Sequence, residues 1–224
     1  MTQSASRKFK DDTYREFAKL AKGLASATRL ELLDLLCQAP RTVEALADLA
    51  GQSVANSSQH LQILRATGLV EAERAGRHIR YRAAEGVCEL FHSLRELAQI
   101  RLPEIRRVTE EFLADRGGME HVALDELVGR VRRGEVTVID VRPREEYLAG
   151  HIPGAVSVPL ETLEDRLGDF PKDRDLVAYC RGPYCVLAVE AVQRLAAFGF
   201  NAVRLEDGVA EWRARGFAVV TEEE

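Results

Sequence analysis

Residues 176–191 read LVAYCRGPYCVLAVEA, an apolar run followed by a short loop and a second apolar run with helical spacing. This order predicts a buried strand, a loop and a helix, with Cys180 where the strand ends and Cys185 where the helix begins. In parallel α/β sheets, ligands and active sites gather at the carboxyl ends of the strands. The stretch therefore predicts an α/β fold around it and a functional loop between the two cysteines.

The segments on either side of this loop continue the alternation of strand and helix that is typical of a parallel sheet. Predicted strands are residues 136–140, 175–179 and 201–205, and predicted helices are residues 121–134, 185–200 and 207–216. We therefore expect an α/β domain with a parallel sheet in the second half of the chain.

The first half of the chain has a different pattern, in which short helices precede a hairpin. Helices are predicted within residues 17–25, 29–38, 42–51 and 54–67, a hairpin within 69–85, and a long helix over 86–112. Thr42 and Ser53 are placed to cap two of the helices, and Gly51 and Gly68 to end them. Two helices joined by a short turn and followed by a hairpin predict a mainly α-helical winged helix-turn-helix domain of α+β class.

The change of pattern places the domain boundary. We assign residues 1–112 to the winged-helix and dimerisation domain, residues 113–120 to a linker around Gly117-Gly118, and residues 121–224 to the α/β domain. Pro103 is expected to kink or divide the long helix before the linker.

Composition narrows the class of protein. The chain has 224 residues and a net charge of −5, with a slightly basic first half and an acidic second half. An acidic chain is not a nonspecific polycation, although a local basic face is compatible with it. The sequence shows no signal peptide, and no apolar run approaches the roughly 18 residues of a membrane span. We therefore expect a cytoplasmic protein without a membrane partner, whose four cysteines are reactive or buried rather than disulfide-bonded.

The second helix of the helix-turn-helix carries polar side chains at its start, where such helices meet base edges in the major groove. These candidate DNA contacts are Ser53, Asn56, Ser57, Gln59 and His60. The hairpin adds Arg74, Arg77, Arg80 and Arg82, which suit phosphate contact. Two other interpretations remain open: the same shape serves as a protein docking module, and arginines on a hairpin are often only a solvated face.

The motif SSQHLQILRATGLV at 57–70, followed by RAGRHIRYR at 74–82, resembles the ArsR family of bacterial repressors over roughly residues 15–100. The resemblance implies a homodimer that binds double-stranded operator DNA and is released by an inducer, with the helix over 86–112 serving dimerisation. It places Ser53, Asn56, Ser57, Ser58, Gln59 and His60 on the recognition helix and Arg74 and Arg77 at the tip of the wing.

The N-terminal cysteines depart from the metal-sensing members of that family. Those members carry a Cys-Val-Cys type motif where this chain has Thr42-Val43-Glu44-Ala45, so we expect no metal site. Cys37 and Cys88 lie in the predicted second and last helices of the domain. Either they pack as small apolar side chains, or, as in some relatives, they form a thiol pair that senses persulfides.

The loop that starts at Cys180 has the properties of an activated nucleophile. Backbone N–H groups at a helix start favour an anion there, which lowers a thiol pKa. Gly182 permits a tight path for the backbone and Pro183 stiffens it. A structural zinc site needs four ligands, and no second Cys or His pair stands near these two cysteines in the sequence. Four residues separate Cys180 from Cys185, whereas Cys-x-x-Cys redox motifs have two. A regulatory disulfide between Cys180 and Cys185 stays open.

The segment VIDVRPREEYLAGHIPGAVSVPL at 138–160, the cysteine loop and LEDGVAEWRARGF at 205–217 together resemble a rhodanese domain, over about residues 121–220. Rhodaneses move a sulfane sulfur from a small donor molecule to a thiophilic acceptor through a cysteine persulfide. By this resemblance, Cys180 carries the persulfide, and Asp140 and Arg142 support the site. The active-site loop comprises Arg181, Gly182, Pro183, Tyr184 and Cys185.

Cys185 is the informative departure, because many thiosulfate-using members have an Arg at that position. The loss of this cation favours a neutral or thiol-borne donor, such as a polysulfide, over thiosulfate. A thiol there could also resolve a persulfide on Cys180. Phosphatases and arsenate reductases of this fold separate Cys and Arg by five residues, but the sixth residue after Cys180 is Val186, so neither activity is expected.

The sequence thus predicts a DNA-binding transcriptional regulator, by family default a repressor, whose rhodanese domain carries or senses sulfane sulfur on Cys180. The alternative is a sulfurtransferase whose DNA-binding half is not coupled to it. Both need a small sulfur donor and a thiol acceptor, and neither needs a cofactor.

Overall fold

The computed structural model describes residues 3–116 and 121–222, so the predicted Gly117-Gly118 linker lies outside the described residues. Contacts divide the chain into two units between Arg95 and Glu96, within helix α5. Helix α6 (Pro103–Ala114) starts with Pro103 in its first turn and has no buried residue. The predicted division of the long helix at Pro103 is therefore confirmed, while the boundary after residue 112 stays a prediction.

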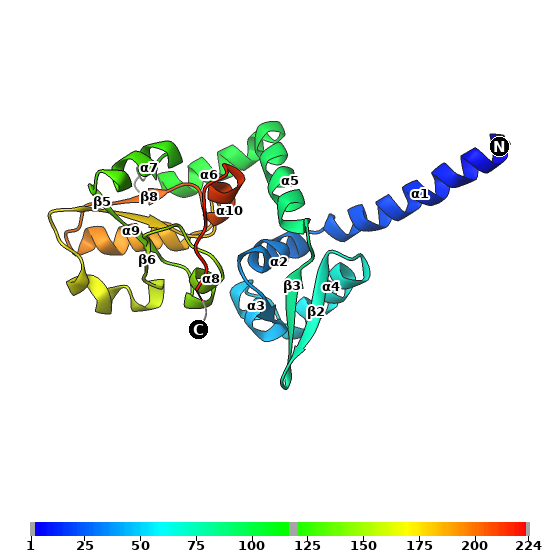
Figure 1. The fold of residues 1–224 in the computed structure, drawn as a ribbon, viewed down its shortest axis with the longest axis horizontal. Helices are drawn as coiled ribbons and strands as arrows, with labels where there is room; N and C mark the ends of the chain where they lie inside the picture. The colour runs from blue at the N-terminus through cyan, green and yellow to red at the C-terminus, as the bar shows by residue number, and fades with distance from the viewer. Residues whose placement is uncertain (1–2, 117–120, 223–224) are drawn as a thin grey trace. The chain divides into compact units, whose positions relative to one another are not determined.

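The N-terminal unit is a winged helix-turn-helix domain (Figure 1). Its elements are α1 (Gln3–Leu24), α2 (Ala27–Gln38), β1 (Arg41–Thr42), α3 (Val43–Leu49), α4 (Val54–Ala66), β2 (Val70–Ala75), β3 (His78–Ala83) and α5 (Val87–Arg101). The three strands form an antiparallel sheet in the order β1-β3-β2. Leucines from α2, α3 and α4 and from the turn before β2 fill the core beneath this sheet, and six of them are fully buried: Leu32, Leu33, Leu46, Leu61, Leu64 and Leu69.

The caps of the helix-turn-helix are those that the sequence predicts. The Thr42 hydroxyl accepts a hydrogen bond from the Ala45 N–H at 3.3 Å, and the Ser53 hydroxyl accepts one from the Asn56 N–H at 3.2 Å. Each cap satisfies a backbone donor that the first turn of a helix leaves unpaired. The hairpin turns at Gly76 and Arg77, between β2 and β3, and the Gly76 φ of +63° suits glycine.

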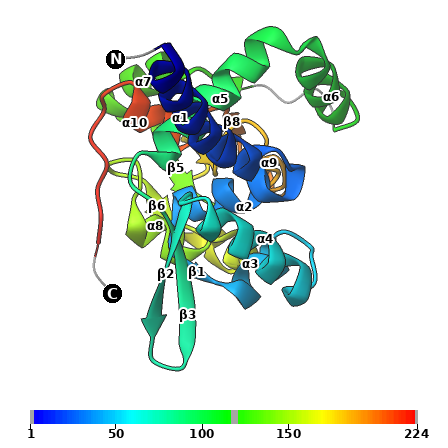
Figure 2. The same cartoon turned by 90° about the vertical axis from the view of Figure 1, so that its right-hand side faces the viewer.

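Helix α1 is longer than the segment 17–25 that its apolar spacing predicted. It carries ion pairs at i, i+3 and i, i+4 spacing, which stabilise a helix that is exposed to solvent. These pairs are Arg7–Asp11, Arg15–Asp12 and Lys19–Glu16. In Figures 1 and 2, α1 is a single uninterrupted helix.

The C-terminal unit is an α/β domain with a five-stranded, all-parallel sheet in the order β4-β8-β7-β5-β6. Its elements are β4 (His121–Val122), α7 (Leu124–Arg132), β5 (Val136–Asp140), α8 (Arg144–Ala149), β6 (Val156–Ser157), the 3-10 helices η1 (Leu160–Thr162) and η2 (Glu164–Asp169), β7 (Asp175–Tyr179), α9 (Leu187–Ala197), β8 (Ala202–Leu205) and α10 (Val209–Ala214). The predicted parallel sheet is confirmed. The two-residue strands β4 and β6 were not predicted, because they are too short to show a periodicity.

Both faces of this sheet are covered, as a parallel sheet requires. Strand β7 alternates between two apolar clusters: Leu176 and Ala178 join the cluster that includes α9, whereas Val177 and Tyr179 join the cluster that includes Trp212 of α10. Cys180 continues the alternation and belongs to the α9 cluster. The strand period therefore directs the Cys180 side chain under the start of α9.

Within the described ranges, no helix combines the length and the apolar character needed to cross a bilayer.

Candidate functional site

Cys180 lies directly after β7, and its side chain is 2% exposed. Its thiol donates a hydrogen bond to the Cys185 carbonyl at 3.4 Å, and the Cys185 N–H donates to the Gly182 carbonyl at 3.1 Å. Gly182 has a φ of +134°, a conformation that disfavours side chains with a Cβ. The loop thus folds back on itself and brings both cysteines to one place.

A buried network fixes the strand ends below this loop. The Asp140 carboxylate at the end of β5 accepts hydrogen bonds from Arg142 Nη2 at 2.6 Å and from the Tyr179 hydroxyl at 2.6 Å. Arg142 Nη2 also donates to the Gly150 carbonyl at 2.8 Å. Burial, and next the Asp140 charge, raise the pKa of Tyr179 well above its usual value, so its hydroxyl stays a donor. Asp140, paired with Arg142, therefore positions Tyr179, the residue before Cys180.

The Arg181 guanidinium is bound to a carboxylate of α8, while its charge still helps to lower the pKa of Cys185. The guanidinium forms a double contact with Glu146 of α8, with Nη2 to Oε1 at 2.7 Å and Nε to Oε2 at 3.0 Å. Glu146 is fully buried, so this ion pair is shielded from solvent and ties the loop to α8. Of the remaining loop side chains, Tyr184 is exposed, and none carries a positive charge.

Gly208, at the start of α10, packs on the loop backbone. A Cβ at this position would lie 2.6 Å from the Arg181 carbonyl carbon and 2.8 Å from the Cys180 carbonyl oxygen. The Gly208 N–H donates to the Glu211 carboxylate at 2.8 Å, which holds this turn in place. Sequence reasoning did not single out Gly208, although it lies in the quoted segment 205–217; only the close approach shows its role.

The thiol acidities differ from the expectation that Cys180 is the thiolate. Burial raises the pKa of Cys180 well above its usual value, and the N–H groups of Ala188 and Gly182 only partly offset this. A hydrogen bond from Cys180 lowers the pKa of Cys185 to about 7, with help from the N–H groups of Arg181 and Leu187. The anion-stabilising backbone of the loop therefore favours a thiolate at Cys185, while Cys180 is a buried thiol at rest.

The predicted DNA contacts fall on α4 and the hairpin tip, with one correction. Ser53 and Gln59 are exposed, and Asn56, Ser58 and His60 are partly exposed. Ser57 is fully buried, because it shares a helix face with Leu61 and Leu64 and so points into the core. Ser57 is therefore wrong as a base or phosphate contact.

The hairpin arginines divide into two groups. Arg74 and Arg77 lie at the exposed tip of the wing. Arg82 pairs with Glu71 across the hairpin, and Arg80 Nη2 donates to the Pro40 carbonyl at 3.1 Å. The tip residues are thus better placed for phosphate contact than the two arginines nearer the body of the domain.

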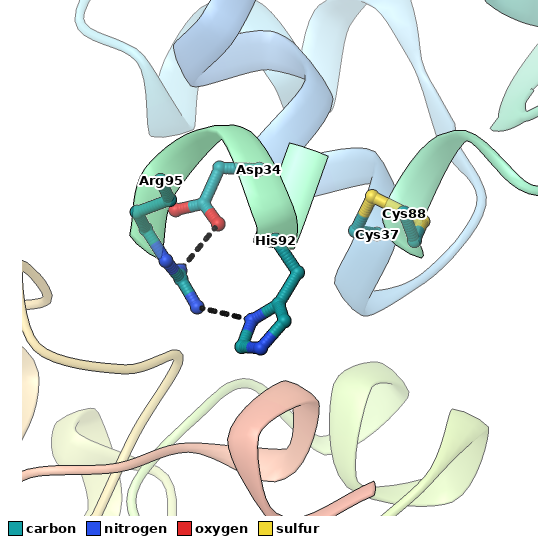
Figure 3. The surroundings of a disulfide bond; sticks show 5 residues. All are labelled: Asp34, Cys37, Cys88, His92 and Arg95. Carbon is teal, nitrogen blue, oxygen red and sulfur yellow. Dashed lines mark hydrogen bonds and ion pairs between the residues drawn. A yellow bond between two sulfur atoms is a disulfide. The ribbon is translucent and has the colours of Figure 1, made fainter. Parts of the chain in front are cut away.

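Cys37 and Cys88 form a disulfide, with their Cα atoms 5.5 Å apart. The bond joins α2 to the first turn of α5 (Figure 3). The expectation of thiols that pack as small apolar side chains is therefore wrong, as is that of a chain without disulfides. Neither residue is fully buried. Their sequence separation of 51 hid the pairing, since only the packing of α5 on α2 brings the two sulfurs together.

Charged groups lie on the same pair of helices as the disulfide. Arg95 Nη1 of α5 is 3.6 Å from Asp34 Oδ1 of α2, and Arg95 Nη2 is 3.4 Å from His92 Nδ1. As Figure 3 shows, Asp34 and Cys37 stand on α2, and Cys88, His92 and Arg95 on α5. A disulfide and an ion pair together hold α5 against α2.

Comparison with known proteins identifies both domains. The family model described as bacterial regulatory protein, arsR family, matches residues 26–72, and the rhodanese-like domain model matches residues 123–215. An HTH-type transcriptional regulator of Mycobacterium tuberculosis is 43% identical over 205 residues, which cover 91% of this chain and 90% of that protein.

Two further proteins each match one domain. A sulfurtransferase of Allochromatium vinosum is 32% identical over 90 residues, 40% of this chain and 82% of its own length. A solved homodimeric winged helix-turn-helix DNA-binding domain of Mycobacterium bovis is 40% identical with a TM-score of 0.40, and the match covers 42% of this chain and 87% of that domain.

The unequal acidities predict that an alkylating agent distinguishes the two thiols. Cys185 should react with iodoacetamide at a rate that rises through about pH 7, because its thiolate forms there, while Cys180 reacts much more slowly. Trypsin separates the two residues into peptides 175–181 and 182–194, so mass spectrometry follows each one. In Cys180→Ala, loss of the Cys180 thiol should raise the pKa of Cys185, so the pH midpoint of its alkylation rate should move upward. Equal rates at every pH would contradict this assignment.

The close approach of Gly208 predicts that Gly208→Ala displaces the loop. The added Cβ meets backbone atoms that have little freedom to move, so we expect a loss of roughly 1–3 kcal/mol in the free energy of unfolding. Alkylation of Cys180 should become faster, because displacement of the loop exposes its thiol. Gly168→Ala is the matched control, since nothing lies within 4 Å of a Cβ there. If both variants unfold and react like the wild type, Gly208 does not hold the loop.

Proposed function

Because the chain belongs to the ArsR family of transcriptional regulators and ends in a rhodanese-like domain, we propose that it is a DNA-binding repressor whose rhodanese-like domain carries sulfane sulfur as a persulfide on Cys180. The observation that carries this proposal is the free Cys180 thiol under a loop of backbone N–H groups between β7 and α9. A persulfide anion is the group that such a loop would stabilise.

Sulfur loading is a single exchange of S–S bonds. The Cys180 sulfur attacks the outer sulfur of a donor persulfide R–S–S⁻, the S–S bond of the donor breaks, and the new bond forms on Cys180. The proton of the Cys180 thiol leaves with the departing group as R–SH. Because the Cys180 pKa is raised by burial, proton removal is part of the barrier, and the neighbouring Cys185 thiolate can accept that proton on its way out.

The charge of the loop favours a thiol-borne donor over thiosulfate. Arg181 is committed to Glu146, and Cys185 stands where thiosulfate-using relatives have an Arg. A dianion would therefore meet backbone N–H groups and no unpaired loop cation. Glutathione persulfide presents a single negative charge at its reacting sulfurs and brings its own thiol leaving group.

The N-terminal domain would bind double-stranded operator DNA as a homodimer. The N-terminal part of α4 offers Ser53, Asn56 and Gln59 to the major groove, and Arg74 and Arg77 would contact phosphates from the wing. Ser58 and His60, partly exposed on α4, stay candidates for the same contacts.

Apolar side chains on α1 and α5 supply a surface for the second copy. Leu90, Leu94 and Leu97 follow one another at i, i+4 and i+7 on α5 and are all exposed. On α1, Phe9 and Phe17 are 67% and 63% exposed. Large apolar side chains gathered on two helices are typical of an interface, which supports a homodimer.

Cys37 and Cys88 would add a thiol sensor in the DNA-binding domain. Their disulfide joins α2, which packs on the recognition helix α4, to the helix proposed for dimerisation. In a reducing compartment such a bond forms only when an oxidant or a persulfide reaches the pair. The bond would then signal the presence of that oxidant or persulfide instead of stabilising the domain permanently. Opening it would free α5 from one of its links to α2.

Catalytic turnover is the second candidate function. Sulfurtransferase relatives of 30–32% identity match this domain over 82–94% of their own length, which favours a competent sulfur carrier. In that case Cys180 would pass its sulfur to an acceptor thiol with no effect on DNA binding.

Sulfur loading is tested by mass spectrometry of the reduced full chain after brief polysulfide treatment. The tryptic peptide 175–181 should gain sulfur at Cys180, and the peptide should stay unmodified in Cys180→Ser. Cys185→Ser serves as the background, because it leaves no second loop thiol that could react with a persulfide on Cys180. A chain that gains sulfur only at Cys37 or Cys88, with none at Cys180 in this background, would overturn the proposal.

Reduction of the Cys37–Cys88 bond should destabilise the DNA-binding domain. In the chain-entropy model a loop of this length contributes about 4 kcal/mol, so the domain should unfold at a lower temperature in a reducing agent. The Cys37→Ser, Cys88→Ser double variant should unfold at that lower temperature with or without the reductant. If the unfolding temperature of the wild type stays the same after its disulfide has been shown to be reduced, the disulfide does not stabilise the domain.

A further inference from the structure

The loop at the end of β7 contains two free thiols with different surroundings. Cys180 is almost fully buried, whereas Cys185 is partly exposed at the start of α9. The Cys180 sulfur lies 3.4 Å from the Cys185 carbonyl oxygen, so the two residues touch across a loop of four intervening residues.

The local chemistry makes Cys185 the stronger nucleophile at neutral pH. The adjoining Cys180 thiol lowers the pKa of Cys185 to about 7, and the backbone N–H groups of Arg181 and Leu187 and the charge of Arg181 add to this. The Arg181 guanidinium is held by Glu146 on α8, and from there its charge acts on Cys185. A thiolate beside a persulfide is the reactive pair of thiol–disulfide exchange.

We infer that Cys185 is the resolving nucleophile of the loop, which converts a persulfide on Cys180 into an intraloop disulfide and releases hydrogen sulfide ion. This inference rests on the proposed function, since it needs sulfur to arrive at Cys180 first. It gives Cys185 a role that the expected anion-binding Arg could not perform.

The step balances in atoms and electrons. The Cys185 thiolate attacks the Cys180 Sγ of Cys180–S–SH, the bond between Sγ and the outer sulfur breaks, and HS⁻ leaves. The sulfane sulfur is reduced by two electrons to sulfide, and the two cysteine thiols are oxidised to one disulfide. Two molecules of a small thiol such as glutathione then restore the dithiol loop and leave as their own disulfide.

Closing the loop would change its structure more than a persulfide does. The Cys180 thiol proton now bonds the Cys185 carbonyl, and this bond is lost when the sulfur joins Cys185 Sγ. The Cys180–Arg181 backbone is held by Gly208 and Glu146, so the movement should fall on residues 182–186 at the start of α9. A disulfide also persists until a thiol arrives, which gives a regulator a longer-lived record of sulfur exposure than a persulfide open to solvent.

The inference is tested on the reduced full chain with glutathione persulfide as the probe and no added thiol. In the wild type, peptides 175–181 and 182–194 should be recovered as one disulfide-linked species, and sulfide should appear at about one equivalent per chain. In Cys185→Ser, the link cannot form, the sulfur should remain on Cys180, and sulfide release should fall at least about tenfold. Cys185→Ala gives the same readout without a hydroxyl, in case serine disturbs the loop.

The outcomes separate this inference from the proposed function. If neither Cys185 variant retains sulfur on Cys180, although both are folded, the proposed function fails. If the variants retain sulfur but the wild type retains it equally and shows no linked peptide, the resolving role of Cys185 is overturned while the persulfide carrier stands. Transfer of the sulfur to Cys185 as a second persulfide would also overturn the resolving role.

Discussion

The buried carboxylate of Asp140 is the interaction on which the C-terminal site depends. It accepts hydrogen bonds from Arg142, two residues further along the chain, and from Tyr179 on the neighbouring strand β7. Both Asp140 and Arg142 are buried from solvent. Removing one partner of such a buried pair typically costs about 3–5 kcal/mol, because the remaining charge stays uncompensated. Since Tyr179 immediately precedes Cys180, its hydrogen bond to the carboxylate fixes the end of β7. The position of the reactive sulfur follows from it.

The loop then follows from two further constraints on its first residues. Glu146 takes the Arg181 cation, and Gly208 brings the start of α10 against the Cys180–Arg181 backbone. Together they immobilise one end of the loop and leave its other end, with Cys185, at the start of α9. The chemical result is a pair of thiols with opposite tendencies. Burial keeps Cys180 protonated, while backbone N–H groups favour the anion at Cys185.

Much of this could be predicted from the sequence because the deciding signals are local. The apolar periods predict β5, β7 and α9, the caps at Thr42 and Ser53 depend on their own helices, and the motifs around Asp140 and Cys180 identify the rhodanese-like domain. What failed depends on tertiary structure. The buried face of α4 removes Ser57 from the DNA surface, the packing of α5 on α2 joins Cys37 to Cys88, and burial reverses the expected order of the thiol acidities.

Both domains carry a cysteine pair, one closed and one open. The proposed repressor acts as a sulfur sensor if sulfur loading of Cys180 changes its affinity for DNA. The most direct measurement is the operator affinity of the full chain before and after treatment with glutathione persulfide, at fixed salt, in a Cys37→Ser, Cys88→Ser background that isolates the rhodanese-like domain. Sulfur treatment should change the affinity in this background, and Cys180→Ser should abolish the change. An affinity that stays constant while mass spectrometry shows Cys180 to be loaded or linked would contradict this sensor role and leave a sulfurtransferase whose DNA-binding half works independently.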